Sequence, residues 1–116
     1  MSAGARRCVV AFFMGVGGLA PQFASADLTA ARQQALRNLL IQDCGSCHGS
    51  TLKGGLGPAL TPAALAGKPA VVLQTVILQG RPGTPMPPWA PFMTEPEAAW
   101  LVEQLQTGVP NGQCNK

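Results

Sequence analysis

The chain has 116 residues and a formal net charge of +3, which predicts at most one small domain without a strong attraction to nucleic acid. Four Phe and two Trp, with no Tyr, supply little aromatic bulk, and a domain of this size buries only a modest fraction of its surface. We therefore expect a further component to complete the core.

The first 26 residues have the pattern of an export signal. Two arginines precede the apolar stretch Cys8–Ala20, and residues 24–26 (ASA) form a small-residue cleavage site. The apolar stretch has about 13 residues, fewer than the roughly 20 that span a bilayer. We expect cleavage after Ala26, which leaves residues 27–116 as one exported, periplasmic domain with no stable membrane anchor.

Two stretches of that domain have helical patterns. Residues 29–42 place an apolar face on one side, made of Leu28, Ala35, Leu36, Leu39 and Leu40. Residues 69–79 begin with a proline and end before Gly80, which suits a C-terminal cap. The residues of this second helix that we expect to be buried are Val72, Leu73, Val76 and Ile77.

The last helix has the clearest start signal. Residues 94–97 (TEPE) form a capping box with a proline in the first turn. The apolar stripe that follows consists of Ala98, Leu101, Val102 and Leu105. Trp100 lies off this stripe, so it either finds a second contact surface or remains partly exposed. A polar tail from about residue 107 ends the domain and holds Cys114.

Long loops separate these helices. Residues 49–62 are rich in Gly and Pro, residues 63–66 are expected to form one short turn, and residues 81–91 contain five prolines. No stretch alternates with the two-residue period of a strand. We predict an all-α domain of three to four short helices, whose long loops are explained if they wrap a cofactor.

The segment 43–50 (DCGSCHGS) places Cys44, Cys47 and His48 within five residues, and His48 is the only histidine of the chain. The C-x-x-C-H spacing is the attachment signature of a c-type haem. Two thiols at this spacing can add to the two vinyl groups of haem, and the next residue is then carried beneath the iron. The export signal favours this interpretation.

Three other chemistries compete for the same residues. A redox dithiol uses this cysteine spacing in a βαβ context, for which the chain offers no strands. A zinc site needs four ligands, but only Cys114 is left to join the motif. A plain disulfide beside an incidental histidine leaves the Gly- and Pro-rich loops without a purpose.

A second axial ligand of the iron cannot be histidine, because His48 is alone. Methionine, lysine, the N-terminal amine, water or a vacant position remain. Met86 stands between Pro85 and Pro87, and this rigidity lowers the entropy cost of presenting a weak ligand. Met93 precedes the last helix and is better explained by packing. His/Met ligation favours ferrous iron, fills both axial positions and predicts electron transfer.

With these features placed, the chain resembles the class I cytochromes c over residues 27–106. The resemblance implies one haem c per chain, with thioether bonds at Cys44 and Cys47 and iron ligation by His48 and Met86. It further implies that the Pro58 carbonyl accepts a hydrogen bond from His48 and that Leu60 packs on the haem. In this family the aromatic of the last helix, here Trp100, crosses the first helix. Many relatives have a glycine at the crossing, where this chain has Leu36 beside Ala35.

More narrowly, LTPAALAGKP and GRPGTPMPPW resemble the NirC-type periplasmic cytochromes of denitrifying bacteria. This likeness implies an electron carrier, not an enzyme, that donates to the dissimilatory nitrite reductase. Two alternatives stay open: an assembly factor for the haem d1 of that reductase, and a haem-based sensor or enzyme with a labile sixth ligand. Lys53, Lys68 and Arg81 either ring the haem edge and steer an acidic partner or are ordinary solvated residues.

Overall fold

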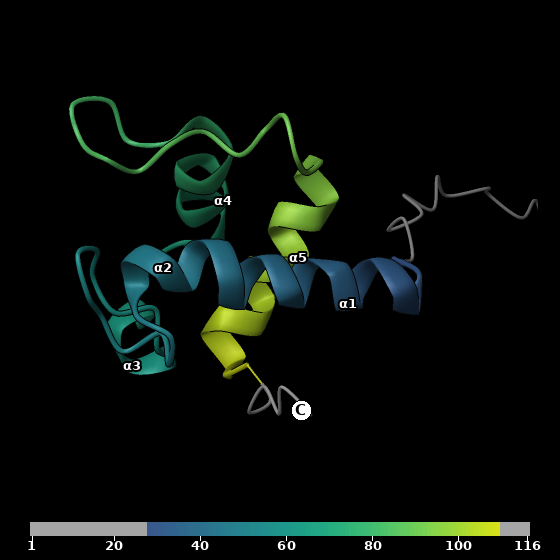
Figure 1. The fold of residues 1–116 in the computed structure, drawn as a ribbon, viewed down its shortest axis with the longest axis horizontal. Coiled ribbons are helices and arrows are strands. Elements are labelled where there is room, and N and C mark those ends of the chain that lie inside the picture. The colour runs from purple at the N-terminus through teal and green to yellow at the C-terminus, as the bar shows by residue number, and fades with distance from the viewer. Residues whose placement is uncertain (1–27, 110–116) are drawn as a thin grey trace, which may run out of the picture.

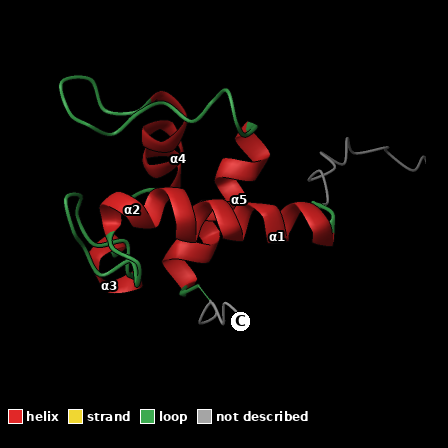
Figure 2. Ribbon diagram, viewed as in Figure 1, coloured by secondary structure: helices red, strands yellow, loops and turns green. Residues whose placement is uncertain are grey.

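The computed structural model describes residues 28–109. The predicted export signal, Cys8 and Cys114 lie outside these residues. The elements are α1 (Ala30–Leu39), the π-helix η1 (Leu40–Cys44), α2 (Gly45–His48), α3 (Pro62–Leu65), α4 (Ala70–Gln79) and α5 (Glu95–Thr107) (Figures 1 and 2). No strand occurs between residues 28 and 109, and the predicted all-α, single-domain fold is confirmed.

The first helix is longer than the sequence predicts. α1, η1 and α2 follow one another without a break, so the helical segment continues from Ala30 through the cysteine motif to His48. It begins at Thr29, whose side chain accepts a hydrogen bond from the Arg32 amide. The π-helix ends at Cys44, so it overlaps the first residue of the cysteine motif, at a place where such turns often mark functional sites.

The core forms where α5 packs against α4, α3 and α1. The predicted stripe of α5 is confirmed, since its four apolar residues are no more than 5% exposed. Other predictions of burial are wrong or hold only in part. Ala35 is exposed and Val72 is 51% exposed, while Leu73, Val76 and Ile77 are half-buried, so no residue of α4 is fully buried. Ala35 and Val72 each lie one residue before a leucine that packs on the core, about 100° away around a helix of 3.6 residues per turn.

α5 crosses α1 (Figure 1), and the predicted contact of Trp100 with the first helix is present. The Arg37 guanidinium lies over the Trp100 ring, 5.2 Å from its centroid, as in a cation–π interaction. Leu36 is fully buried in the same core cluster as Ala98. The small residue at this contact is therefore Ala98 of α5, and its short side chain leaves room for Leu36 of α1.

A second contact ties the start of α5 to α1. Glu97 completes the capping box by accepting a hydrogen bond from the Thr94 amide at 2.7 Å. The same carboxylate accepts two hydrogen bonds from the Arg32 guanidinium, at 2.5 and 3.1 Å. Arg32 also donates to the Phe92 carbonyl at 3.0 Å. These bonds, led by those from Arg32, lower the pKa of Glu97 from 4.5 to about 2.

Glu97→Gln is expected to destabilise the domain by about 1 kcal/mol near neutral pH, because the variant keeps a capping amide but loses the ion pair. Since the folded-state pKa of Glu97 lies below its ordinary value, the ion pair contributes fully above pH 4.5, and its contribution is lost as the pH falls toward 2. Denaturant unfolding of both proteins across this range measures the difference.

The matched control for this prediction is Glu95→Gln, which removes the same charge from an exposed position in the same helical turn. We expect this variant to change the stability by no more than a few tenths of a kcal/mol. A Glu97→Gln variant that is equally stable, or whose deficit persists unchanged at pH 2, contradicts the prediction.

Candidate functional site

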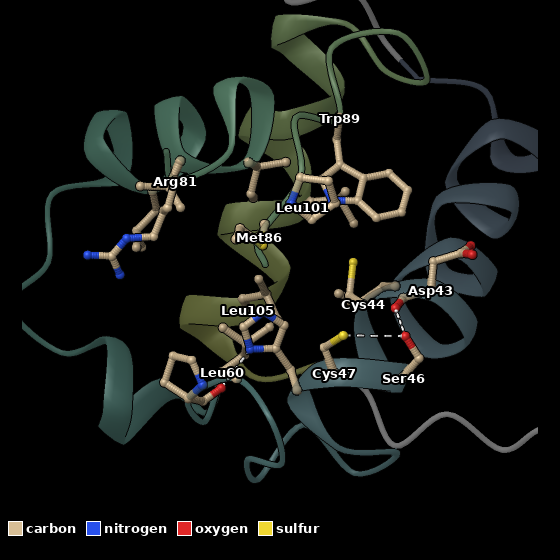
Figure 3. Close-up of a pocket in the computed structure, with 18 of the residues that line it drawn as sticks. Asp43, Cys44, Ser46, Cys47, Leu60, Arg81, Met86, Trp89, Leu101 and Leu105 are labelled. Carbon is tan, nitrogen blue, oxygen red and sulfur yellow. Dashed lines mark hydrogen bonds between the residues drawn. The ribbon is translucent and has the colours of Figure 1, made fainter. Parts of the chain in front are cut away.

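A cavity of about 600 Å³ opens into the core, within the range of roughly 300–1,000 Å³ typical of small-molecule and cofactor sites. It lies between the helical segment ending in α2, the loop after it, α4, the loop after α4, and α5 (Figure 3). All six site residues that the sequence singles out line it: Cys44, Cys47, His48, Pro58, Leu60 and Met86. The remaining lining residues are mostly apolar and shared with the core.

His48 is held by the loop that follows it. Its Nδ1 atom lies 2.7 Å from the Pro58 carbonyl oxygen. Because a carbonyl can only accept, Nδ1 carries the proton, and the lone pair of Nε2 is left free for a metal ion. A second contact comes from Gly57: a Cβ atom at this position would lie 2.8 Å from the imidazole ring. The absence of a side chain at Gly57 therefore lets the loop approach the ring.

Backbone hydrogen bonds attach this loop to the end of α2. The Gly54 amide donates to the His48 carbonyl and the Gly57 amide to the Cys47 carbonyl, both at 2.8 Å. These carbonyls have no partner within the helix because the helix ends there. A Cβ atom at Gly49 would lie 2.5 Å from the Gly54 carbonyl oxygen, so the tight return of the chain requires glycine.

The two cysteines line the same side of the cavity (Figure 3). Both are free thiols; Cys44 is half-buried and Cys47 exposed. Burial, and next the nearby Asp43 carboxylate, raise the pKa of Cys44 to about 11. A redox dithiol instead needs a thiol of lowered pKa. The environment of Cys44 therefore disfavours dithiol–disulfide exchange.

Met86 reaches the cavity from the loop after α4. That loop runs back along the end of α4, where the Trp89 amide donates to the Ile77 carbonyl at 3.0 Å and the Ala90 amide to the Leu78 carbonyl at 3.1 Å. At its tip the Met86 carbonyl accepts from the Arg81 amide at 3.1 Å. Hydrogen bonds to the last carbonyls of α4 thus hold the Met86 loop, just as hydrogen bonds to the last carbonyls of α2 hold the loop after His48.

Met93 differs from Met86 in its surroundings. It is 5% exposed and belongs to the core cluster, although it also borders the cavity. Met86 is less buried and belongs to no core cluster. Of the two methionines, Met86 is therefore the one without a packing role among the buried residues.

Three features of the site either were not predicted from the sequence or differ from the prediction. The contact of Gly57 with His48 was not predicted, because the sequence placed Gly57 only within the Gly- and Pro-rich loop of residues 49–62. Thr84, whose hydroxyl accepts a hydrogen bond from the Met86 amide at 3.3 Å, was not considered. For Lys53, Lys68 and Arg81 the sequence left open a place at the haem edge or an ordinary solvated position; Arg81 lines the cavity, and Lys53 and Lys68 do not. A Gly before a Pro, and a hydroxyl two residues before a methionine, are signals too common to have indicated these contacts.

Cys44, Cys47 and His48 do not form a metal site with other His, Cys, Asp or Glu side chains of the described residues. Among residues 28–109, no three of His, Cys, Asp and Glu come together in a way that could hold a metal ion. The zinc site that the sequence leaves open is therefore not assembled by the residues that the structure describes.

Residues 31–104 match the family described as "Cytochrome C oxidase, cbb3-type, subunit III". The chain belongs to this family of c-type cytochromes. Its c-type cytochrome domain thus extends from α1 to near the end of α5.

Individual relatives agree with this membership. The cytochrome is 58% identical over 88 residues to cytochrome c55X of Pseudomonas aeruginosa, an alignment that covers 76% of this chain and 74% of the relative. The solved structure of a c-type cytochrome NirC superposes with a TM-score of 0.69 and 59% identity, covering 70% of this chain and 95% of that one. The cytochrome is also 34% identical to the dihydro-heme d1 dehydrogenase of Pseudomonas aeruginosa, over 80% of this chain but only 19% of that protein.

Membership in the c-type cytochromes implies haem c with its iron, and the residues of this site fit that group. The cavity is apolar and of suitable volume, two thiols stand on one side of it, and a nitrogen lone pair and a thioether are available as iron ligands. The apolar side chains that line it are those that a cofactor would cover, which agrees with the expectation that a further component completes the core.

Proposed function

We propose that this cytochrome carries one covalently bound haem and transfers electrons. In the proposed site Cys44 and Cys47 form the thioether bonds, His48 and Met86 ligate the iron, and Leu60 packs on the macrocycle. The observation that carries the proposal is the shared cavity, which His48 enters from the end of α2 and Met86 from the loop after α4. Hydrogen bonds hold the loop after each of these helices against the helix end. Bound haem supplies an iron that takes up and releases one electron.

The residues of the site determine how such an iron behaves. The Pro58 carbonyl fixes the His48 ring and raises its basicity. The Met86 thioether is a soft donor that favours the ferrous state and raises the reduction potential. If His48 and Met86 both held the iron, the side chains of the protein would leave no open position for a substrate. This favours electron transfer over oxygen or peroxide chemistry.

For the setting of this function, we propose export of the protein to the periplasm after cleavage of residues 1–26. None of the helices within residues 28–109 is long and apolar enough to cross a membrane. The proposed acceptor is the dissimilatory nitrite reductase of denitrification, on the basis of the likeness to the NirC and c55X cytochromes.

A role in the maturation of haem d1 is the second candidate. It is favoured by one observation, the 34% identity to a segment of a protein named dihydro-heme d1 dehydrogenase. In this case the cytochrome would act together with the proteins that make or insert haem d1, and a stable complex with one of them is expected.

The test begins with the absorption spectrum of the protein purified from a host that attaches haem. A haem band that survives denaturation and extraction establishes covalent attachment, and its absence overturns the proposal.

Stopped-flow mixing of the reduced cytochrome with nitrite reductase then measures electron transfer. Rapid oxidation of the cytochrome without a stable complex supports the carrier role. Slow oxidation together with a stable complex with a haem d1 maturation protein supports the second candidate. Ready binding of carbon monoxide by the ferrous protein instead favours a sensor or enzyme.

A further inference from the structure

Among residues 28–109, Arg81 is the only lysine or arginine that lines the cavity. Figure 3 shows it on the side of the cavity opposite Cys44 and Cys47, with Met86 between them. The other charged lining residue, Asp43, stands beside the cysteines. The two ends of the cavity therefore differ in charge, with an acidic residue at the thiol end and a basic residue at the far end.

The two opposite edges of haem also differ in charge, and only one of them is negative. Its two vinyl groups lie on one edge of the macrocycle and its two propionate carboxylates on the opposite edge. If Cys44 and Cys47 hold the vinyl edge, the carboxylates must leave at the far end of the cavity. That is the end at which Arg81 stands.

We infer that Arg81 binds a carboxylate of the haem, an inference that rests on the proposed function. A guanidinium presents a planar fork of N–H groups that matches a carboxylate, and an ion pair of this kind is stronger and more directional than one formed by lysine. Arg81 thereby acts as a positioning residue: it orients the cofactor at the edge opposite the thioethers and neutralises a negative charge near the iron.

The main chain of Arg81 is already fixed in place. Its carbonyl accepts hydrogen bonds from the Thr84 hydroxyl at 2.7 Å and the Thr84 amide at 3.0 Å, and its amide donates to the Met86 carbonyl. The residue before it, Gly80, has a φ of 69°, and a Cβ atom there would lie 2.7 Å from the Met86 carbonyl oxygen. The same turn that carries Met86 thus anchors the base of the Arg81 side chain.

Because these bonds all involve the main chain of Arg81, substitution of its side chain leaves the turn intact. The test compares Arg81→Gln and Arg81→Lys with Lys68→Gln, which removes the same charge from an exposed residue outside the cavity. The haem-loaded proteins are studied by resonance Raman spectroscopy, in which the propionate bending band reports hydrogen bonding to the carboxylates. The ratio of ferric to ferrous protein is measured at one applied potential.

Arg81→Gln is expected to shift the propionate band and to raise the ferric-to-ferrous ratio about two- to fivefold, because an unpaired carboxylate favours the more positive iron and a partly exposed ion pair is of modest strength. Arg81→Lys should fall between this variant and the unaltered protein, and Lys68→Gln should leave the band in place. If Arg81→Gln matches Lys68→Gln in both measurements, the inference is wrong. Failure of the unaltered protein to hold covalent haem overturns the proposed function and the inference with it.

Discussion

Replacing Met86 by alanine is expected to lower the reduction potential by on the order of 0.1–0.3 V, a substantial part of the ~0.8 V over which axial ligands tune haem proteins. The thioether that favours ferrous iron is removed, while Cys44, Cys47 and His48 still hold the haem. The ferrous variant should bind carbon monoxide readily, whereas the unaltered protein should not. Redox titration and carbon monoxide difference spectra of the two purified proteins measure these changes.

Met93→Leu is the control, since Met93 is the other methionine that borders the cavity. The substitution conserves side-chain volume in a core position, so we expect it to cost less than about 1.5 kcal/mol of stability and to leave the potential and the carbon monoxide behaviour unchanged. The reverse pattern, in which Met93→Leu alters the spectrum and Met86→Ala does not, assigns the ligand to Met93. Neither methionine is the ligand if both variants keep the original spectrum.

Replacing Gly57 by alanine is expected to destabilise the haem-loaded protein by about 1–3 kcal/mol through overpacking. The added methyl group would lie 2.8 Å from the Cε1 and Nδ1 atoms of His48, shorter than a real contact allows. The ring cannot move away freely, because the Pro58 carbonyl holds one nitrogen and, in the proposed site, the iron holds the other. Thermal unfolding should show a lower Tm, by roughly 4–8 °C for each kcal/mol.

The backbone of Gly57 does not itself require glycine, since its φ is not among the positive values of the domain. The steric contact can therefore be separated from backbone strain. Gly45→Ala serves as the matched control in the same segment, because a Cβ atom at Gly45 would have its nearest neighbours at an ordinary 3.7 Å. We expect this control to be neutral or slightly stabilising in the helix. Equal stabilities of the two variants would show that the His48 ring yields to the added methyl group.

Parts of the fold and site that depend on neighbours along the chain could be predicted from the sequence. The capping box at Thr94 and the C-terminal cap at Gly80 consist of residues a few positions apart, and both are present. The prolines around Met86 predicted a loop without helix or interior strand, and residues 81–91 form neither. These features are local because steric restriction by proline and capping by nearby side chains act within one or two turns.

Parts that depend on the direction of a side chain were predicted less well. Val72 belongs to the apolar run of residues 70–73, and Ala35 stands next to Leu36 on what the sequence indicates is the apolar face of the first helix. Consecutive residues of a helix point about 100° apart, and here Leu36 and Leu73 face the core while Ala35 and Val72 do not. Which residue of such a run is buried depends on the position of the neighbouring helix, and composition does not contain this information.

The attachment motif, the lone histidine, the candidate ligands Met86 and Met93 and the all-α class could all be derived from the sequence, because they follow from residue identity and short spacing. Three features required the packed structure: His48 and Met86 open into one cavity, Gly57 lies against the imidazole, and Arg81 is the one basic residue among residues 28–109 that lines the cavity. Arg32 and Glu97 illustrate the reason: they are 65 positions apart in the chain and are joined by hydrogen bonds. Contacts at such separations exist only once helices have packed, and they depend on the angles and register of that packing.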